Sequence, residues 1–442
     1  MRKMVRAELT AFLSLIFLLL LSLIGAVTQA ASIQLLKNEK RADASRAIES
    51  VYAEYQKELF EEYGILGIEA TYESGDWKES NILNRLSYYG MENMETDINA
   101  LRLLTDQNGK PFFEQAVNYQ KEKMVLGDVN KFLGTYESWQ DLPKVDDLDH
   151  EFEEELEQLP EENNPLNIIS DLKRKSLLQL VAPKDFELSE NQIRLSEQVS
   201  HRKLKTGEGL EESSVTRGDA IFFNFYLADY FKSAVQAAER NGLKYELEYL
   251  ISGKKSDKEN LEESLINICN IRFMANYAYL MTDEGKKAEA ALVAGALCSM
   301  IPVPGMNEIT SQAILLAWAY GESIMDLRVL MEGKKVELMK SGDNWKLSIQ
   351  GLMDLQNNSL DEQMEKGEKG LTYEQYLQML LLVEKKEVLS MRALDLIELH
   401  IVKDKEQSYF RADHCVVGSK VDTKCRLDRG ITYQFTQTYQ YQ

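Results

Sequence analysis

The stretch that decides the fold is residues 9–31, LTAFLSLIFLLLLSLIGAVTQAA, which carries no charged side chain. As a helix it would span roughly 34 Å, slightly more than a ~30 Å hydrocarbon core. Arg2, Lys3 and Arg6 precede it, and positive charge before a span holds the N-terminus in the cytoplasm. The stretch therefore predicts a single-pass membrane anchor with the body of the chain outside the cell.

A cleaved signal peptide is the alternative interpretation of the same residues. Its apolar part is usually ~7–15 residues long and ends at small residues. Here the apolar part runs from Leu9 to Ile24, and GAVTQAA offers a weak cleavage site after Ala30.

The sequence that follows favours an anchor, because nothing in it breaks a helix. Residues 26–63 contain no glycine or proline, and Gly64 is a ready helix stop. Apolar residues recur at three- and four-residue steps, which predicts one stripe on a helix. They are Ala44, Ile48, Val51, Tyr52, Tyr55, Leu59 and Phe60. A single helix over Leu9 to Tyr63 is therefore expected.

The charge balance excludes one class of partner. Acidic residues outnumber basic ones 72 to 51 in 442 residues, giving a formal net charge of -21. Binding of nucleic acid needs a basic stripe, so no nucleic-acid partner is expected.

The remaining residues predict a helix-rich α+β fold with small antiparallel sheets behind the membrane helix. Residues 288–306 are apolar but short for a second span, so a buried core helix is expected there. Residues 333–349 predict a hairpin, and residues 410–441 predict an antiparallel terminal sheet. The expected parts are residues 1–8 (cytoplasmic), 9–31 (transmembrane), 32–63 (amphipathic helix), 64–144 (first extracellular lobe), 145–165 (acidic linker) and 166–442 (second extracellular lobe).

The four cysteines form no metal-binding pair and no dense disulfide framework. Cys269 and Cys298 lie in apolar helical surroundings, which indicates plain buried thiols. Cys415 and Cys425 flank VVGSKVDTK, a possible hairpin in which the two sulfurs would face each other. A disulfide between them is a candidate, alongside two free thiols.

No catalytic or cofactor-binding motif is present. The four histidines form no zinc-protease pair, and there is no GxSxG elbow and no phosphate-binding loop. The acidic run 145–165 lacks the fixed loop spacing of a calcium-binding EF-hand. We expect neither an enzyme nor a resident cofactor or metal.

Several blocks in a fixed order resemble a known group of proteins. They are ELTAFLSLIFLLLLSLIGAV, AIESVYAEYQKELFEEYGILGIE, LKYELEYLISGKKSDKENL, LAWAYGESIMDLRVLMEGKKVELMKSGDNWKLSI, GLTYEQYLQMLLL and SMRALDLIELHI. The chain resembles an uncharacterised Firmicutes family of single-pass proteins encoded beside Tad pilus genes and described as TadE/TadG-like, or pilin-like. The resemblance covers nearly the whole chain.

The resemblance implies an anchored component or accessory of a pilus-like assembly, with other pilin-like proteins as partners. It also implies an assembly contact for Glu8, an acid at the entrance of the membrane helix. Lys3 departs from the pilin pattern, because prepilin peptidase prefers Gly or Ala at that place, and pilin-type processing is in doubt. The alternative function is a tethered or secreted extracellular binding or sensory domain.

Overall fold

The computed structural model describes residues 2–124, 134–138, 140, 176–210, 218–298, 305–354, 369–427 and 430–441. The predicted acidic linker 145–165 lies outside them. The chain divides into two compact units, and each contains more than one stretch of sequence. Residues 1–115, 204–214 and 407–442 form the first, and residues 116–203 and 215–406 form the second.

The first unit begins with a long helix, α1 (Arg2–Tyr52). The predicted single helix to Tyr63 is wrong, because residues 53–56 leave the helical conformation before α2 (Lys57–Tyr63) begins. Gln56 is extended, and its N–H donates to the Gly67 carbonyl at 2.8 Å, which fixes the turn. Gly64 ends α2 in the left-handed conformation, as its position predicts.

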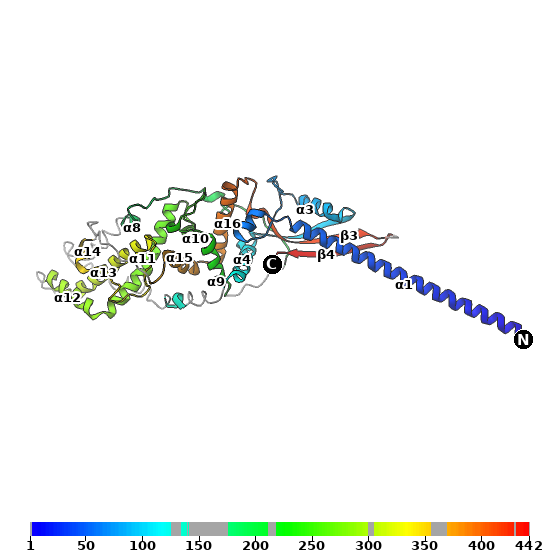
Figure 1. Ribbon diagram of the computed structural model, residues 1–442, viewed down its shortest axis with the longest axis horizontal. Helices are drawn as coiled ribbons and strands as arrows, with labels where there is room; N and C mark the ends of the chain where they lie inside the picture. The colour runs from blue at the N-terminus through cyan, green and yellow to red at the C-terminus, as the bar shows by residue number, and fades with distance from the viewer. Residues whose placement is uncertain are drawn as a thin grey trace. The chain divides into compact units, whose positions relative to one another are not determined.

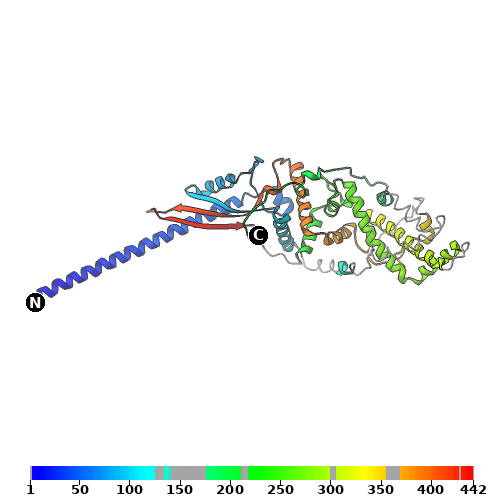
Figure 2. The ribbon, with the colours of Figure 1, turned by 180° about the vertical axis from the view of Figure 1, so that it is seen from behind.

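A small antiparallel sheet completes the first unit, together with α3 (Glu79–Leu86) and the single π-turn η1 (Ser87–Met91). Its strands are β1 (Ile68–Glu69), β2 (Met94–Leu103), β3 (Cys415–Arg426) and β4 (Thr432–Gln440). β3 is central, with β2 on one edge and with β4 and the short β1 on the other. Figures 1 and 2 show β3 and β4 running beside the second half of α1.

The C-terminal strands confirm the predicted antiparallel pair. They belong, however, to the first unit rather than to a lobe spanning 166–442, because β3 pairs with β2 from the early part of the chain. α4 (Asp106–Lys123) follows β2, with three positive-φ residues, 107–109, before Pro111.

The second unit is helical in its described part. Its α-helices are α8 (Leu177–Val181), α9 (Asp219–Tyr230), α10 (Glu246–Ser252), α11 (Asp257–Thr282), α12 (Glu284–Cys298), α13 (Met306–Met331), α14 (Ile349–Asp354), α15 (Tyr373–Val383) and α16 (Lys386–Lys403). Ser256 caps α11 by accepting the N–H of Glu259. Thr372 and Gln375 form a complete capping box on α15.

Two expectations for this unit need correction. Helix α12 buries only one stripe, Ala290, Ala294 and Cys298, while Leu292 is 77% exposed, so it is not a fully buried helix. The predicted hairpin at 333–349 is also absent: Val336 forms an isolated bridge with Leu371 instead. The loop after it is held by side chains of α11 and α13 rather than by a strand ladder.

Candidate anchoring and assembly surface

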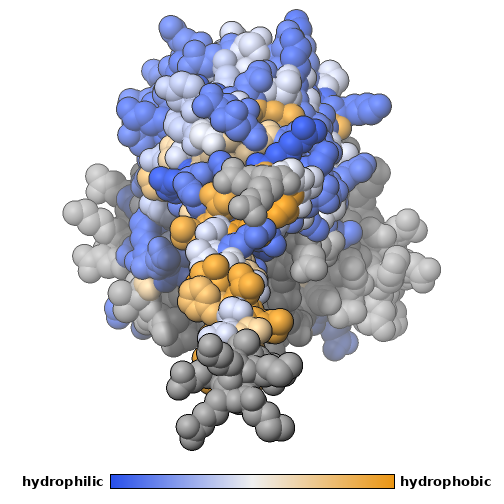
Figure 3. Space-filling view, turned by 90° about the vertical axis from the view of Figure 1, so that its right-hand side faces the viewer, coloured by the Kyte–Doolittle hydropathy of each residue, from blue (hydrophilic) through white to orange (hydrophobic). Residues whose placement is uncertain are grey.

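The first half of α1 leaves its apolar side chains in contact with solvent. Between Leu9 and Val27 every residue is exposed, and most of the side chains are large and apolar. Figure 3 shows orange side chains along the part of this helix that projects towards the viewer. Burying one large apolar side chain is favourable by roughly 1.5–3 kcal/mol, so such a surface needs an apolar environment. Length and hydropathy are compatible with a single-pass membrane anchor.

The second half of α1 is different, because it buries one face. The buried stripe consists of Ala44, Ala47, Ile48, Val51 and Tyr52. Tyr52 stacks on Tyr439 of β4, with ring centroids 4.2 Å apart. It also meets the edge of Tyr441 at 5.2 Å. The change from exposed to buried therefore occurs within one continuous helix.

Strand β4 follows α1 over several turns and runs in the same direction. Lys37 and Arg41 lie over the Tyr433 ring at 5.2 and 5.5 Å, near the start of the strand. Tyr441 lies at its end, beside Tyr52. Fifteen helical residues rise about 22 Å and eight strand residues about 26 Å, so the two elements match in length.

The N-terminal candidates are placed only by their backbone. Arg2, Lys3, Arg6 and Glu8 lie within α1, and their side chains fall outside the described part of the chain. The orientation set by the three basic residues and the assembly contact of Glu8 remain predictions.

Of the two alternatives for Cys415 and Cys425, the structure contradicts the disulfide. Both residues lie on β3, at opposite ends of one continuous strand, so ten residues put their Cα atoms roughly 33 Å apart. A disulfide needs Cα atoms about 4.4–6.8 Å apart. VVGSKVDTK is the middle of a strand instead of a turn, because its valines and threonine pair with β2 and β4. All four cysteines are buried free thiols, and burial raises the pKa of Cys425.

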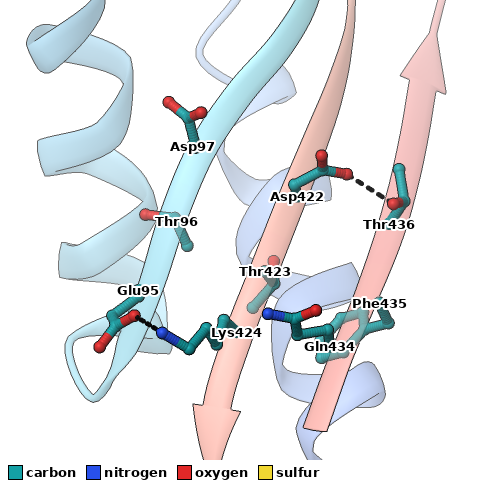
Figure 4. Close-up of a pocket in the computed structure, with 9 residues that line it drawn as sticks. All are labelled: Glu95, Thr96, Asp97, Asp422, Thr423, Lys424, Gln434, Phe435 and Thr436. Carbon is teal, nitrogen blue, oxygen red and sulfur yellow. Dashed lines mark hydrogen bonds and ion pairs between the residues drawn. The ribbon is translucent and has the colours of Figure 1, made fainter.

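The sheet face turned away from α1 carries a shallow polar hollow of about 440 Å³ (Figure 4). Lys424 donates to Glu95 at 2.7 Å, and this hydrogen bond lowers the pKa of Glu95. Thr436 donates to Asp422 at 2.5 Å. Asp97 is the cross-strand partner of Asp422. The hollow offers hydrogen-bond donors and acceptors across three strands.

Ser200, His201 and Asp395 meet in the second unit, but not in the order of a catalytic triad. Ser200 Oγ donates to Asp395 at 2.5 Å and lies 2.8 Å from His201 Nδ1. In a catalytic triad the histidine lies between the serine and the carboxylate. Here Ser200 lies between His201 and Asp395. Tyr249 donates to the same carboxylate at 2.7 Å. Burial raises the pKa of Asp395 to about 6. Sequence reasoning missed the cluster because Asp395 is 195 residues from Ser200.

A fully buried ion network also holds the second unit together. Asp326 accepts from Arg272 Nε at 3.0 Å and from Lys340 at 2.7 Å. Lys340 also pairs with Glu322 at 2.5 Å. Burial alone would raise the pKa of Asp326, but the two cations outweigh it and the pKa is lowered. Arg328, two residues after Asp326 on α13, donates to the Leu180 carbonyl at 2.7 Å.

Among the described residues no group of three or more His, Cys, Asp or Glu side chains is arranged to hold a metal ion. Comparison with known families matches residues 155–427 to DUF5702, a family of unknown function. The chain belongs to this family. The matched region begins after α1 and ends before β4. Searches of curated proteins and of solved structures gave no match.

Proposed function

We propose that the protein is a membrane-anchored, pilin-like structural or accessory component of a Tad-type pilus or similar surface assembly, with no catalytic role. The observation that carries the proposal is the change along α1 from an exposed apolar half to a half packed on a sheet. Such a helix suits a subunit that is held in the bilayer while its outer part contributes to an assembly. The resemblance to Tad-associated proteins supports the same role.

The topology of this proposal follows from the charges before the anchor. Arg2, Lys3 and Arg6 would keep the N-terminus in the cytoplasm. The sheet and the helical unit would then lie outside the cell. Partners would be other pilin-like proteins in the same membrane, and Glu8 would contact them at the membrane entrance.

Copurification from membranes tests this role for Glu8. The Glu8→Ala variant should retain less of the pilin-like partner proteins than the wild type, at equal membrane content. Glu39→Ala is the matched control, because Glu39 is an exposed acid further along the same helix. Unchanged copurification of the Glu8→Ala variant would count against the pilin-like use of this residue.

A tethered binding or sensory domain is the second candidate. The polar hollow lined by Glu95, Asp97, Asp422, Lys424 and Thr436 favours it, because small ligands need convergent polar groups. Its test is a screen of envelope fragments for changes in the NMR or mass-spectrometric signal of these residues. A ligand bound there with no protein partner at α1 would favour the second candidate over the first.

A further inference from the structure

Strand β4 is an edge strand whose outer side has no partner in the described part of the chain. It pairs with β3 over nine consecutive positions without a register shift, from Thr432 opposite Arg426 to Gln440 opposite Gly418. No described strand or bridge lies on its other side. An unpaired edge of this length is a ready template for a strand from another chain.

The hydrogen-bond pattern identifies which backbone groups are free. Leu427 donates to the Ile431 carbonyl, and Tyr441 donates to the Val417 carbonyl. Because antiparallel pairs alternate, the odd-numbered residues of β4 bond to β3 and the even-numbered ones point their N–H and C=O groups outward. The outward groups belong to Thr432, Gln434, Thr436, Thr438 and Gln440.

The composition of β4 lacks the features that normally protect an edge. Its sequence TYQFTQTYQ has no charge, no proline and no glycine, in a chain that is 28% charged. Threonine, tyrosine and phenylalanine are also strong strand formers. Natural edge strands are usually interrupted by lysine, proline or bulges.

The opposite edge, β2, has those protective features. It carries the exposed acids Glu95 and Asp97, and its register shifts twice, between Ile98 and Ala100 and between Arg102 and Leu103. Near Leu101 it is also covered by a bridge to Glu208. As far as the described residues go, one edge of the sheet is therefore protected and the other is open.

We infer that the outer edge of β4 binds an extended, uncharged segment of another protein, which adds to the sheet as a further strand. Main-chain hydrogen bonds to the even-numbered residues would supply the affinity, as in other cases of strand addition. The side chains decide which segments fit. Beside the Thr and Gln row of the outer face the new strand needs small polar residues, and a charged residue there would find no counter-charge on β4.

A second copy of this chain fits the edge poorly, an argument that rests on the proposed anchoring. Two β4 edges paired antiparallel are related by a two-fold axis perpendicular to the strands. Because β4 runs in the same direction as α1, that axis would make the α1 helices of the two copies antiparallel. The second α1 would then point away from the shared bilayer. A parallel pair of β4 strands would offset equal residues by one position, which a closed two-fold dimer does not allow.

Peptide binding to the full chain in detergent tests the edge directly. The probe is a fluorescent synthetic peptide with the sequence of residues 431–441, ITYQFTQTYQY, carrying two added N-terminal lysines for solubility. Fluorescence anisotropy should show saturable binding to the wild type. Thr436→Pro removes an outward N–H and no main-chain bond to β3, so it should weaken binding roughly tenfold or more with the fold retained. It also loses the hydroxyl bond from Thr436 to Asp422, which Thr436→Ala loses as well. Thr436→Ala keeps that N–H and should bind like the wild type.

Absence of binding to the wild type, or equal binding to the Thr436→Pro variant, would overturn the inference. A Thr436→Cys variant in cell membranes identifies the occupant. A disulfide-linked dimer of the chain under oxidising conditions would show that a second copy occupies the edge, and would overturn the inference that another protein binds there. A chain that stays monomeric supports the inference. The peptide assay does not depend on α1 being in a membrane, so failure of the anchoring proposal would leave its result readable.

Discussion

Asp326 holds two buried cations at once, and the cost of losing it can be predicted. Replacing Asp326 with alanine leaves Arg272 and Lys340 buried without this partner. Breaking a buried pair in this way costs about 3–5 kcal/mol of unfolding free energy. Urea unfolding of the purified chain in detergent would measure it. Lys424→Ala, which breaks the exposed pair with Glu95, is the control and should lower the unfolding free energy far less. If the Asp326→Ala and Lys424→Ala variants lost the same unfolding free energy, the importance assigned to burial would be contradicted.

Asp395 makes a pH-dependent contribution whose sign follows from its raised pKa. The folded-state pKa is about 6 and the ordinary value 3.8, so the folded chain binds this proton more tightly than the unfolded chain. As the pH rises from about 4 to about 6, the Asp395 carboxyl loses its proton and the unfolding free energy falls. Above about pH 6 it falls no further on account of this group. Relative to the Asp395→Asn variant, the wild type should lose about 3 kcal/mol over that range. A difference between the two that does not vary with pH would contradict the assignment.

At the scale of elements, the contact between α1 and β4 depends on Tyr52. Tyr52 is 3% exposed and packs against the rings of both Tyr439 and Tyr441. Tyr52→Ala should lower the unfolding free energy by roughly 3 kcal/mol, because a large buried side chain is lost from a packed site. Tyr88→Ala is the matched control, since Tyr88 is 75% exposed and should change stability little. A small effect at Tyr52 would mean that α1 is not held to the sheet by this contact.

Sequence patterns predicted the elements that carry local signals. The spacing of Ser256 and Glu259 is typical of a helix start, and α11 begins there; the alternation of the last residues marks β4. The break at residues 53–56 has no such signal, because no glycine or proline occurs there and the apolar spacing continues through it. It is fixed by a backbone bond from Gln56 to Gly67, which only the folded chain provides.

Sites made from residues far apart in the chain could not be predicted from the sequence for the same reason. Nothing local links Ser200 to Asp395 or Arg272 to Asp326, since helix packing brings each pair together. For Cys415 and Cys425 the local pattern suggested a contact that the folded chain does not make. Their spacing predicted a turn, yet pairing with β2 and β4 keeps the segment between them extended.

At the scale of the whole molecule, the exposed half of α1 should decide where the protein resides. Each arginine at the centre of a membrane helix costs about 2.5–3.5 kcal/mol of insertion free energy. The double variant Leu18→Arg, Leu20→Arg should therefore shift the protein out of the membrane fraction. Leu18→Ile with Leu20→Ile keeps the hydropathy and should leave the distribution unchanged. Immunoblots of membrane and soluble fractions would measure both, and an unmoved arginine variant would contradict anchoring by this segment.

The most direct test of anchoring is the intact mass and N-terminal residue of the mature protein, measured in membrane and culture fractions. The proposal predicts a membrane-bound chain that retains residues 9–31. A mature chain that begins at Ala31 and is found in the medium would contradict it, because the opening stretch would then be a signal peptide.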